Sequence, residues 1–510
     1  MWKICFIVAK VLMMFTAADC AGFSLPSKRL QDVQIVIIGA GASGIAAASR
    51  LLENKIDDFV ILEATYYYGG RIKTVRFGED FIDLGSHFVH GVKSNIVFNM
   101  AGQLQLLTNY EESKPDIIFI DPSGNLVNRN VASKVYHLLN DIRDSMARDI
   151  HNYSGSLGEY FNQQYRRKMD EHSLSNFSLA RPLLQWYHRF RNEDSPNSWF
   201  ETSSCGETEY LECEKSQLWS WKFGGYATVF DLLMQSIPDP KEELPVKYKI
   251  HYHNEVAKIK WDNLPEEYMN KVIVECSDGI SYLADFVLVT VSLGVMKEKA
   301  QTMFQPVLPS TKLNAIKGLG FGVVDKIFLK FPHRWWPDNY TNFGFLWPHD
   351  DACNLNSVKQ EDCWDRALNK FSEVDNLPLI LCGWLSGPAA RYMEQLSDEE
   401  VKHKVVQLLD RFIGKTFNVT VPAPDLFLRS AWSSDPHFRG SHSFYSTETE
   451  KIGVSAAQLA EPVTNKNRKP VLLFAGEATH TSHYSTVHGA IESGWREAER
   501  IIELSKLWKQ

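Results

Sequence analysis

Apolar runs of strand length alternate with helical patterns at both ends of the chain. A run at 33–39 is followed by a glycine-rich turn, by a helical stretch over 45–54 and by a second apolar run at 59–63. A strand, a helix and a strand within about thirty residues are typical of the start of a doubly wound parallel sheet. Near the other terminus, 471–476 has the pattern of a buried strand, and 487–507 has apolar positions at helical spacing. We therefore predict an α/β domain to which both ends of the chain contribute.

The middle of the chain shows two further kinds of pattern. Residues 134–200 have helical periodicity without a strong strand signal, which predicts an inserted helical subdomain. Strand patterns separated by turn residues predict a meander attached to the first domain, at 252–261, 271–276 and 286–291. A second domain with a mixed sheet is predicted from strands near 326–331 and 379–384 and a helix near 398–412. Both domains are thus discontinuous, the first made of 33–110, 220–300 and 428–507 and the second of 111–219 and 301–427.

The size and charge of the chain narrow the classes of function. With 510 residues, 44% of them hydrophobic and 23% charged, the composition is that of a globular protein larger than one domain. The 54 Lys and Arg residues are outnumbered by 62 Asp and Glu residues, and no run of five or six basic residues occurs. This argues against a nucleic-acid partner. A net charge of -8 favours the approach of a polycation, and it is equally compatible with solubility alone.

Residues 1–20 have the features of a secretory signal peptide. A short basic start is followed by an apolar stretch from Ile4 to Phe15 and by small residues at the end of the segment. The stretch is too short for a comfortable membrane span, but Lys10 interrupts it and leaves an uncleaved anchor as the alternative. A secreted, glycosylated protein is also favoured by four Asn-x-Ser/Thr sequons, at Asn152, Asn176, Asn339 and Asn418. We expect no stable membrane span once the signal is removed.

The cysteines outside this segment fall into close pairs and core positions. In an oxidising compartment we expect disulfides, with free half-buried thiols as the alternative, for two pairs: Cys205 with Cys213, and Cys353 with Cys363. Cys276 and Cys382 lie in strand-like runs and are expected in the core. No spacing in the chain resembles a metal site, so none is predicted.

A glycine-rich turn follows the first predicted strand. Gly39, Gly41 and Gly44 fit G-x-G-x-x-G between that strand and the helix. Glycines at these positions let the backbone approach a pyrophosphate, whose charge meets free N–H groups at the helix N-terminus. Glu63 ends the second strand, where its carboxylate can accept hydrogen bonds from an adenosine ribose. Together these features predict a dinucleotide bound to a Rossmann-like domain.

Two glycines and a cation follow the acidic residue at close range. Gly69, Gly70 and Arg71 are not expected if the chain is a nicotinamide-dependent dehydrogenase. An exposed turn with a solvated arginine is the alternative to a role in cofactor binding. The segment resembles the FAD-dependent amine oxidases, in particular the spermine and acetylpolyamine oxidases, in which this turn packs on the cofactor. The resemblance covers 33–502, with five strong blocks and a weak match over 110–218. It implies that Arg71 neutralises phosphate charge, and that FAD is also contacted by Ser43, Ala64 and Val256.

A second block, residues 473–498, is similar to the segment that closes the FAD site in these oxidases. The resemblance implies that Glu477 binds the ribitol, and that the helix beginning near Thr486 and Val487 points its positive end at the flavin. Two-electron reduction places negative charge on the flavin, so a helix N-terminus at this position stabilises the reduced state. Tyr484 and Ser485 of the same block are expected to contact the substrate.

Two further blocks contain the candidate catalytic residues. Residues 83–91 resemble the segment that runs under the flavin, with Gly85 and Ser86 against the cofactor. In this segment His90 is expected to face the substrate, and a satisfied core histidine is the alternative. Lys326 lies in an apolar, strand-like run, where a solvated lysine is unexpected except at a sheet edge. The resemblance implies that Lys326 hydrogen-bonds a water that bridges to flavin N5, and burial there would lower its pKa.

The last block, residues 428–444, resembles a segment of the family in which a tryptophan packs near the flavin and an aromatic residue stands beside the substrate. Trp432 and Phe444 occupy these positions. Tyrosine is frequent at the second position, so the missing hydroxyl of Phe444 leaves the substrate preference open. Monoamine oxidases attach FAD through a cysteine in this region, and none lies between Cys382 and the C-terminus. We therefore expect noncovalent FAD.

The resemblance implies oxidation of a secondary-amine C–N bond of spermine or an acetylated polyamine by O2. The products would be an aldehyde, a shorter amine and H2O2, with Lys326 and His90 as the catalytic residues. A related L-amino-acid oxidase is the alternative, in which Arg439 or Arg391 would pair with a substrate carboxylate. The third hypothesis is a secreted flavoprotein that acts as a binding protein without turnover. The presence of four expected site residues argues against it: Glu63, Arg71, Lys326 and Glu477.

Overall fold

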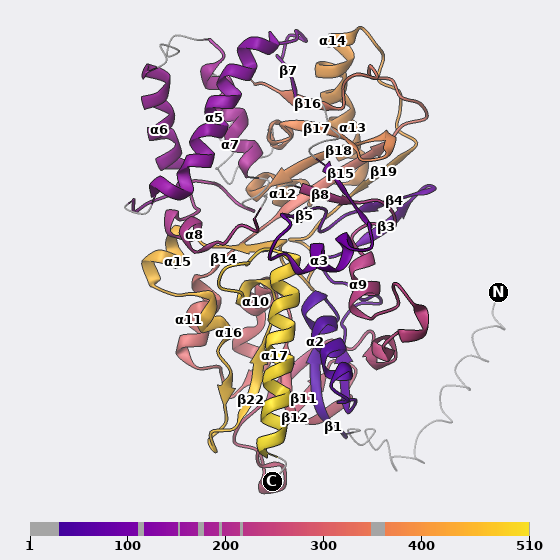
Figure 1. Ribbon diagram of the computed structural model, residues 1–510, viewed down its shortest axis with the longest axis vertical. Coiled ribbons are helices and arrows are strands. Elements are labelled where there is room, and N and C mark those ends of the chain that lie inside the picture. Colours follow the sequence, from indigo (N-terminus) through magenta and orange to yellow (C-terminus); the bar gives the residue numbers. More distant parts are fainter. Residues whose placement is uncertain are drawn as a thin grey trace, which may run out of the picture.

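The structure is a computed structural model that describes residues 30–110, 117–150, 153–171, 178–192, 196–214, 218–347 and 363–508. The predicted signal peptide lies outside these residues, as do the sequons at Asn152 and Asn176. The described chain is elongated (Figure 1). The helices α2 (Ala42–Glu53) and α17 (Val487–Trp508) lie with the larger sheet at one end, and a group of three helices, α5 to α7, lies beside a second sheet at the other.

The larger sheet has nine strands, and its centre is parallel. β1 (Leu30–Ile38) lies between β2 (Phe59–Leu62) and β12 (Ser281–Val289) and runs parallel to both. The sheet order is β13-β10-β11-β12-β1-β2-β9, and β22 pairs with β12 and β21. The outer strands are β9 (Ile250–His251), β10 (Val256–Lys260), β11 (Val272–Cys276), β13 (Phe304–Gln305), β21 (Val463–Thr464) and β22 (Pro470–Phe474). Nearly all residues of β2 and β12 are buried, as expected for strands covered on both faces.

Helices from opposite ends of the chain cover one face of this sheet. α2 (Ala42–Glu53) and α17 (Val487–Trp508) pack side by side (Figure 1), and their apolar residues share one core with β1 and β2. A Cβ at Gly494 would lie 2.3 Å from the carbonyl oxygen of Ser43, so the two helices meet backbone to backbone. The other face is covered by α10 (Leu293–Met303) and α11 (Ser310–Gly318). The prediction of a doubly wound α/β domain that both ends of the chain form is confirmed.

The second sheet is mixed, as predicted. Its order is β19-β15-β18-β17-β16-β7, antiparallel except for the parallel pair β16 and β7. The strands are β7 (Ile118–Ile120), β15 (Val324–Lys330), β16 (Asn342–Phe345), β17 (Lys370–Val374), β18 (Leu377–Ser386) and β19 (Leu426–Arg429). α13 (Asp398–Leu409) packs on this sheet and begins with a capping box in which Ser397 and Glu400 satisfy each other's backbone N–H groups.

The helical subdomain consists of α5 (Arg129–Asp149), α6 (Leu157–Glu171) and α7 (Ala180–Arg191). Phe161, Trp186 and Tyr187 are its largest fully buried side chains, and their rings contact one another or common neighbours. The indole N–H of Trp186 donates to the carbonyl oxygen of Asn369 at 2.7 Å, which ties the subdomain to the second sheet.

Short elements connect these layers. The strands are β3 (Thr74–Phe77), β4 (Asp80–Asp83), β5 (Val89–His90), β6 (Leu107–Asn109), β8 (Leu218–Trp221), β14 (Gly320–Gly322) and β20 (His442–Phe444). The helices are α3 (Ile96–Gly102), α8 (Ser204–Glu209), α9 (Thr228–Leu233), α12 (Gly387–Met393), α14 (Lys415–Phe417), α15 (Thr447–Ile452) and α16 (Ala456–Ala460).

Two assignments made from the sequence differ from the structure. The strand 304–305, placed above in the second domain, pairs in parallel with β10 of the larger sheet. The predicted disulfide between Cys205 and Cys213 is wrong, because both thiols are free. Cys213 is buried with its sulfur 3.7 Å from Nε2 of His488, so it packs into the core instead of facing its predicted partner. Cys353 of the second pair lies outside the described residues.

Two surface features bear on the expected secretion. Asn339 and Asn418 are exposed, so the two sequons within the described chain are accessible. Among the residues that the structure describes, no helix combines the length and the apolar character needed to cross a membrane.

Candidate active site

A cavity of about 810 Å³ is lined by residues from both sheets and from the helical subdomain. Of the residues predicted to form the site, only Gly44 does not line it. Those that do are Gly39, Gly41, Ser43, Glu63, Ala64, Gly70, Arg71, Gly85, Ser86, His90, Val256, Lys326, Trp432, Phe444, Glu477, Tyr484, Ser485, Thr486 and Val487. Residues that are more than 400 positions apart in sequence therefore share one cavity.

The three glycines of the first turn are required for different reasons. Gly39 has a φ of +106°, a conformation that L side chains rarely adopt. A Cβ at Gly44 would lie 2.0 Å from the carbonyl oxygen of Gly39, so this glycine allows the helix to pack against the strand. Gly41 has an ordinary φ of -79°, and a Cβ there would meet no protein atom within 4 Å. Neither fold nor packing requires a glycine at position 41, and the space beside it opens to the cavity.

The start of α2 faces this open space. Its N-cap residue is Gly41, which provides no side-chain cap, so the first N–H groups of the helix remain available to a ligand. Glu63 lies beside them: Oε2 accepts the N–H of Ala40 at 2.8 Å, and Oε1 accepts the N–H and hydroxyl of Thr65. These bonds fix the carboxylate at the cavity wall and leave Oε2 with capacity for one more donor. An anion and a hydroxyl-bearing group are the ligands that this arrangement suits.

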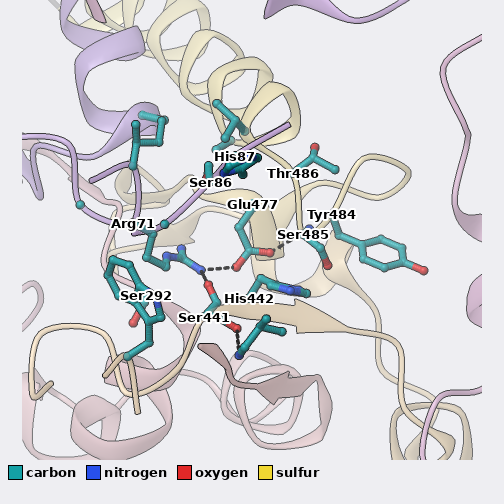
Figure 2. Close-up of a pocket in the computed structure, with 18 of the residues that line it drawn as sticks. Arg71, Ser86, His87, Ser292, Ser441, His442, Glu477, Tyr484, Ser485 and Thr486 are labelled. Atoms are coloured by element: carbon teal, nitrogen blue, oxygen red, sulfur yellow. Dashed lines mark hydrogen bonds and ion pairs between the residues drawn. The ribbon is translucent and has the colours of Figure 1, made fainter. Parts of the chain in front are cut away.

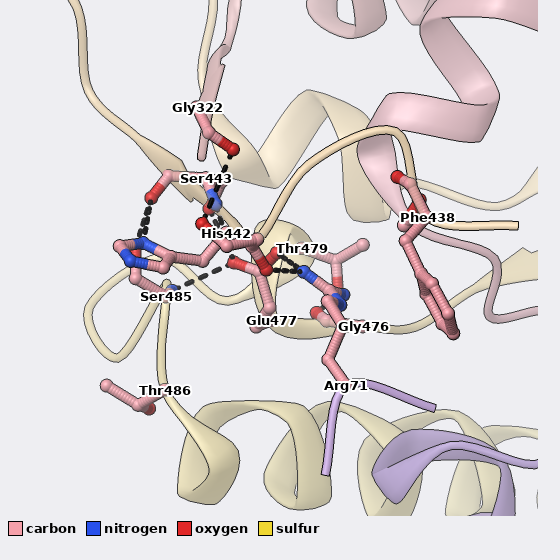
Figure 3. A network of polar contacts seen from close by, with 12 residues as sticks. Arg71, Gly322, Phe438, His442, Ser443, Gly476, Glu477, Thr479, Ser485 and Thr486 are labelled. Carbon is pink, nitrogen blue, oxygen red and sulfur yellow. Dashed lines mark hydrogen bonds and ion pairs between the residues drawn. The ribbon is translucent and has the colours of Figure 1, made fainter. Parts of the chain in front are cut away.

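Arg71, which is half-buried, and the buried Glu477 form an ion pair at the centre of the cavity wall (Figure 2). One guanidinium nitrogen, Nη1, lies 2.8 Å from Glu477 Oε1 and donates to the carbonyl oxygen of Ser441. The other carboxylate oxygen accepts the hydroxyl of Ser443 at 2.5 Å and the N–H of Ser485 at 2.9 Å (Figure 3). Burial raises the pKa of Glu477, but the charge of Arg71 and these hydrogen bonds outweigh it and lower that pKa below its usual range. The carboxylate is therefore ionised, and its charge already neutralises that of Arg71.

The N-terminus of α17 also points into the cavity. Thr486 and Val487 line it, and the hydroxyl of Thr486 accepts the N–H of Gly489 at 3.0 Å as an N-cap. The N–H groups of the first turn that have no partner within the helix place partial positive charge at this wall. A ligand that gains negative charge is stabilised there.

Lys326 is the buried cation of the cavity. It lies on β15 opposite Trp384 of β18, and its Nζ is 4.5 Å from the centre of the Trp384 ring. Nζ donates to the carbonyl oxygens of Asp83 and Gly85, at 2.8 and 2.5 Å. Two of its three hydrogen-bonding positions are thus used, and the third is available on the cavity side. Burial lowers the pKa of Lys326 to about 8, although Cys382 and Asp83 act in the opposite direction.

Comparison with known proteins identifies the family to which this site belongs. The family model for flavin containing amine oxidoreductase matches residues 42–502. The chain belongs to this family. It is 31% identical to the peroxisomal N(1)-acetyl-spermine/spermidine oxidase of Bos taurus, over 92% of this chain and 95% of that protein. It is 27% identical to the probable polyamine oxidase 5 of Arabidopsis thaliana, over 93% and 98% of the two chains.

Two solved structures have the same fold. An engineered putrescine oxidase superposes with a TM-score of 0.65 at 16% identity, over 93% of this chain and all of that one. Cyclohexylamine oxidase from Brevibacterium oxydans IH-35A also gives 0.65, at 17% identity, with 93% and 100% covered. The protein is thus an FAD-dependent amine oxidase that acts on a small-molecule amine with O2.

FAD fits the cavity on the evidence of these residues. The open space at Gly41 and the uncapped N-terminus of α2 suit the pyrophosphate, and Glu63 suits a ribose hydroxyl. The positive N-terminal end of α17, with Lys326 in the same cavity, suits a ring system that becomes more negative on reduction. Gly44 acts indirectly, because it lets α2 approach the strand.

The residues predicted to face the substrate differ in how they are held. His90 is exposed to the cavity on β5, whereas Phe444 is buried on β20. The hydroxyl of Tyr484 donates to the carbonyl oxygen of Gly206 at 2.9 Å, so its ring has a fixed position. The hydroxyl of Ser485 donates to the carbonyl oxygen of Ser443, and this residue therefore shapes the wall through its backbone (Figure 3).

Several cavity residues were missed by the sequence analysis. His87 and Trp384 have ring centres 6.0 Å apart, and Phe88 and Tyr110 have ring centres 4.5 Å apart. Trp384 could have been found from the strand pattern, because the strand 379–384 was predicted but its pairing with Lys326 was not. α5 and α7 add a mixed set of polar and aromatic residues to the wall: Tyr136, Asn140, Arg143, Asp144, Tyr187, Phe190 and Arg191.

The arginines proposed for an amino-acid oxidase face elsewhere. Arg439 pairs with Glu298 through two contacts of 2.5 and 2.9 Å. Arg391 donates to the hydroxyl of Ser433. Neither is among the described residues that line the cavity, so neither is placed to bind a substrate carboxylate.

Asp325 holds the segment that carries Trp432. Asp325 precedes Lys326 on β15, so its side chain points to the opposite face of the strand, away from the cavity. On that face Oδ1 accepts the hydroxyl of Ser430 at 2.7 Å and the N–H of Trp432 at 3.3 Å. Burial raises the pKa of Asp325 well above its usual range, and the nearby charge of Glu394 adds to this. The carboxyl therefore keeps its proton to a higher pH in the folded protein than in the unfolded chain.

A substitution at Asp325 tests this protonation. The native state keeps a proton that the unfolded chain releases near pH 4, so the unfolding free energy should fall as the pH rises above that value. We expect Asp325→Asn to remove this fall while keeping the acceptor for Trp432, with a stability within about 1 kcal/mol of the wild type at pH 7. Asp325→Leu should lose about 2 kcal/mol or more, because buried donors lose their acceptor. Thermal unfolding between pH 4 and 8 with saturating FAD measures both, and a pH dependence kept in Asp325→Asn would place the proton elsewhere.

Proposed function

We propose that this amine oxidase is a polyamine oxidase that cleaves a secondary-amine C–N bond of spermine or an acetylated polyamine. The observation that carries the proposal is the single cavity in which the nucleotide cradle, the buried Lys326 and an aromatic compartment meet. The names of its relatives as acetylpolyamine and polyamine oxidases agree with it.

The aromatic compartment suits the reactive nitrogen. An amine must lose its proton before it can give up a hydride from the adjacent carbon, and a poorly hydrated slot favours the uncharged form. Trp384, Phe444 and Tyr484 supply apolar ring surface in this part of the cavity. His90 is exposed on the same wall and can orient the amine by accepting or donating a hydrogen bond.

The distant amines of a polyamine remain charged and need anionic partners. Besides Glu63 and Glu477, five carboxylates line the cavity: Asp144, Glu212, Glu255, Glu373 and Asp375. Arg143 pairs with Glu212 at 2.6 Å, and Arg334 pairs with Glu373 at 2.6 Å, so part of this negative charge is already neutralised. A substrate with one end acetylated carries fewer charges and needs fewer of these groups.

The overall reaction consumes one amine, one O2 and one water. FAD, when bound, accepts the hydride equivalent from the carbon beside nitrogen and passes two electrons to O2, giving H2O2. Water then hydrolyses the imine to an aldehyde and a shorter amine. The noncovalent attachment of FAD is part of the proposal. Lys326 holds its third hydrogen-bonding position toward the cavity for a water at the reaction centre.

An assay of peroxide with purified protein tests this proposal against its alternatives. We expect H2O2 from spermine, spermidine or N1-acetylspermine, and none from L-amino acids. Peroxide from amino acids alone would assign the protein to the amino-acid oxidases. Bound FAD without peroxide from any of these amines would support a flavoprotein that binds without turnover.

We also propose that the protein is secreted and glycosylated. The signal-like segment at 1–20 and the exposure of Asn339 and Asn418 support this. Expression in animal cells should give protein in the medium whose mass falls on treatment with an N-glycosidase. Retention of the full-length, unglycosylated chain inside the cells would reject secretion.

A further inference from the structure

Three side chains behind the cavity wall form a compact cluster. They are His480 and His483 in the turn before α17, and Glu492 within that helix, with exposed side-chain fractions of 18%, 13% and 27%. The imidazole rings stack with centres 4.9 Å apart and 10° between their planes. Oε2 of Glu492 lies 3.0 Å from Nε2 of His480 and 2.7 Å from Nδ1 of His483. None of the three lines the cavity within the described part of the chain.

The hydrogen bonds of His480 fix its tautomer. Nδ1 accepts the backbone N–H of His483 at 2.8 Å and that of Ser482 at 3.3 Å, so this nitrogen carries the lone pair. The proton must then be on Nε2, which donates it to Glu492. Burial raises the pKa of Glu492, but the hydrogen bonds from the two histidines outweigh it and lower that pKa to about 2. One carboxylate oxygen thus accepts an N–H from each ring.

This tautomer argues against a metal ion at the cluster. The ligand atoms of the three residues lie within 4.8 Å of one another, a spacing at which an ion could be held. A metal-binding histidine usually donates its second N–H to a neighbouring acceptor, whereas the second nitrogen of His480 itself accepts from the backbone. The geometry is that of a carboxylate clamped by two imidazoles.

The turn held by this cluster forms part of the substrate and cofactor wall. Between His480 and α17 lie Tyr484, Ser485 and Thr486, all of which line the cavity. Ser485 has a φ of +68°, which is unfavourable for a residue with a side chain and must be stabilised by its surroundings. Thr486 donates its hydroxyl to the carbonyl oxygen of His483 at 2.7 Å, so a displacement of His483 would reach the start of α17 directly.

We propose that Glu492, through His480 and His483, is a positioning residue that holds the Tyr484–Val487 wall in the shape that binds the amine substrate. The carboxylate fixes two imidazoles, the imidazoles fix the turn, and the turn sets the ring of Tyr484 and the backbone of Ser485. The inference rests on the proposed function in so far as this wall contacts a polyamine. The cluster does not touch the reacting atoms, so it acts on binding more than on chemistry.

Substitutions at the cluster should therefore separate KM from kcat. Glu492→Ala removes the two hydrogen bonds that hold the turn and so loosens the wall that faces the substrate, and we expect the polyamine KM to rise about tenfold. The kcat should stay within about threefold, and FAD should remain bound, because Glu63 and the start of α2 are untouched. His483→Leu should behave like Glu492→Ala, whereas His483→Asn should recover most of the wild-type KM, because an amide N–H can replace Nδ1–H. Glu503→Ala, an exposed change on the same helix, is the matched control and should have no effect.

Hydrogen exchange of the 480–486 backbone supplies a readout independent of turnover. Exchange there should be faster in Glu492→Ala than in the wild type and in Glu503→Ala. If the wild type oxidises no polyamine while this difference is present, the clamp stands and the proposed function fails. Unchanged exchange and unchanged KM in Glu492→Ala would overturn the clamp. A transition metal bound one per chain and lost in Glu492→Ala would also overturn it, in favour of a metal site.

Discussion

Lys326→Met should slow the reaction of the reduced enzyme with O2 by about 100-fold while leaving FAD bound, since positioned proton-donating groups contribute factors of 10² to 10⁴. Methionine fills a similar volume, but it removes the only described lysine that donates to both Asp83 and Gly85 at the cavity wall. Glu63 and the start of α2, which we expect to hold the nucleotide, are untouched. Stopped-flow measurement of the oxidation of chemically reduced enzyme isolates this step from substrate binding.

The pH dependence of the same step provides a second test of Lys326. Its pKa is about 8, so the ammonium dominates below that pH and the neutral amine above it. If the ammonium is the active form, the rate of the wild-type enzyme with O2 should fall as the pH rises through about 8. No amine substrate is present in this experiment, so its ionisation does not contribute. Lys326→Met should be slow and insensitive to pH in this range.

Lys330→Met is the matched control for this substitution. Lys330 lies on the same strand, but its Nζ pairs with Asp80 at 2.8 Å and it does not line the cavity among the described residues. The Lys330→Met variant should be oxidised by O2 at the wild-type rate and with the wild-type pH profile. Wild-type oxidation kinetics in Lys326→Met would remove Lys326 from the reaction centre and leave it a structural tie between β15 and the Asp83–Gly85 segment.

Features that depend on local sequence were predictable, and features that depend on side-chain packing were not. The G-x-G-x-x-G turn is recognisable because strand, turn and helix follow each other directly, and Gly39 and Gly44 satisfy constraints within that unit. Lys326 stands out because a charged residue interrupts an apolar strand. Trp384 lies in a predicted strand, but its place beside Lys326 comes from an antiparallel pairing of β15 with β18, more than fifty residues later, which the sequence pattern does not reveal.

The wrong prediction of a disulfide between Cys205 and Cys213 also arises from side-chain packing that the local sequence does not reveal. Cys205 and Cys213 are close in sequence and lie in polar segments, which favours a short loop. The structure instead places Cys213 against His488 and Gly91, where a Cβ on the glycine would lie 2.5 Å from the Cβ of Cys213. Tertiary packing therefore decides the direction of this side chain. The cluster of His480, His483 and Glu492 was missed for a similar reason, since its members meet only when the turn folds back on α17.

Glu63→Ala should reduce the affinity for FAD by about 100-fold, because a hydrogen bond to a charged group contributes about 1.5–3 kcal/mol and the substitution removes every acceptor at this position. The side chain is 8% exposed, and its oxygens accept from Ala40 and Thr65 as well as facing the cavity. The variant therefore loses both the partner for the ribose and the support of the turn that starts at Gly39. Absorbance of the purified protein gives the FAD content, and titration of the apoprotein gives the Kd.

Glu53→Ala separates this local effect from a general loss of charge near α2. Glu53 lies at the far end of the same helix with its side chain 36% exposed, so its removal should leave the FAD content unchanged. Glu63→Gln keeps acceptor oxygen for the Ala40 N–H and should fall between the wild type and Glu63→Ala. Because ligand binding stabilises the folded state, the melting temperature of Glu63→Ala should rise with added FAD only at concentrations about 100-fold higher than for the wild type. Equal Kd values for the wild type, Glu63→Gln and Glu63→Ala would show that the ribose does not bind at Glu63. The adenosine end of the cofactor would then lie in another part of the cavity.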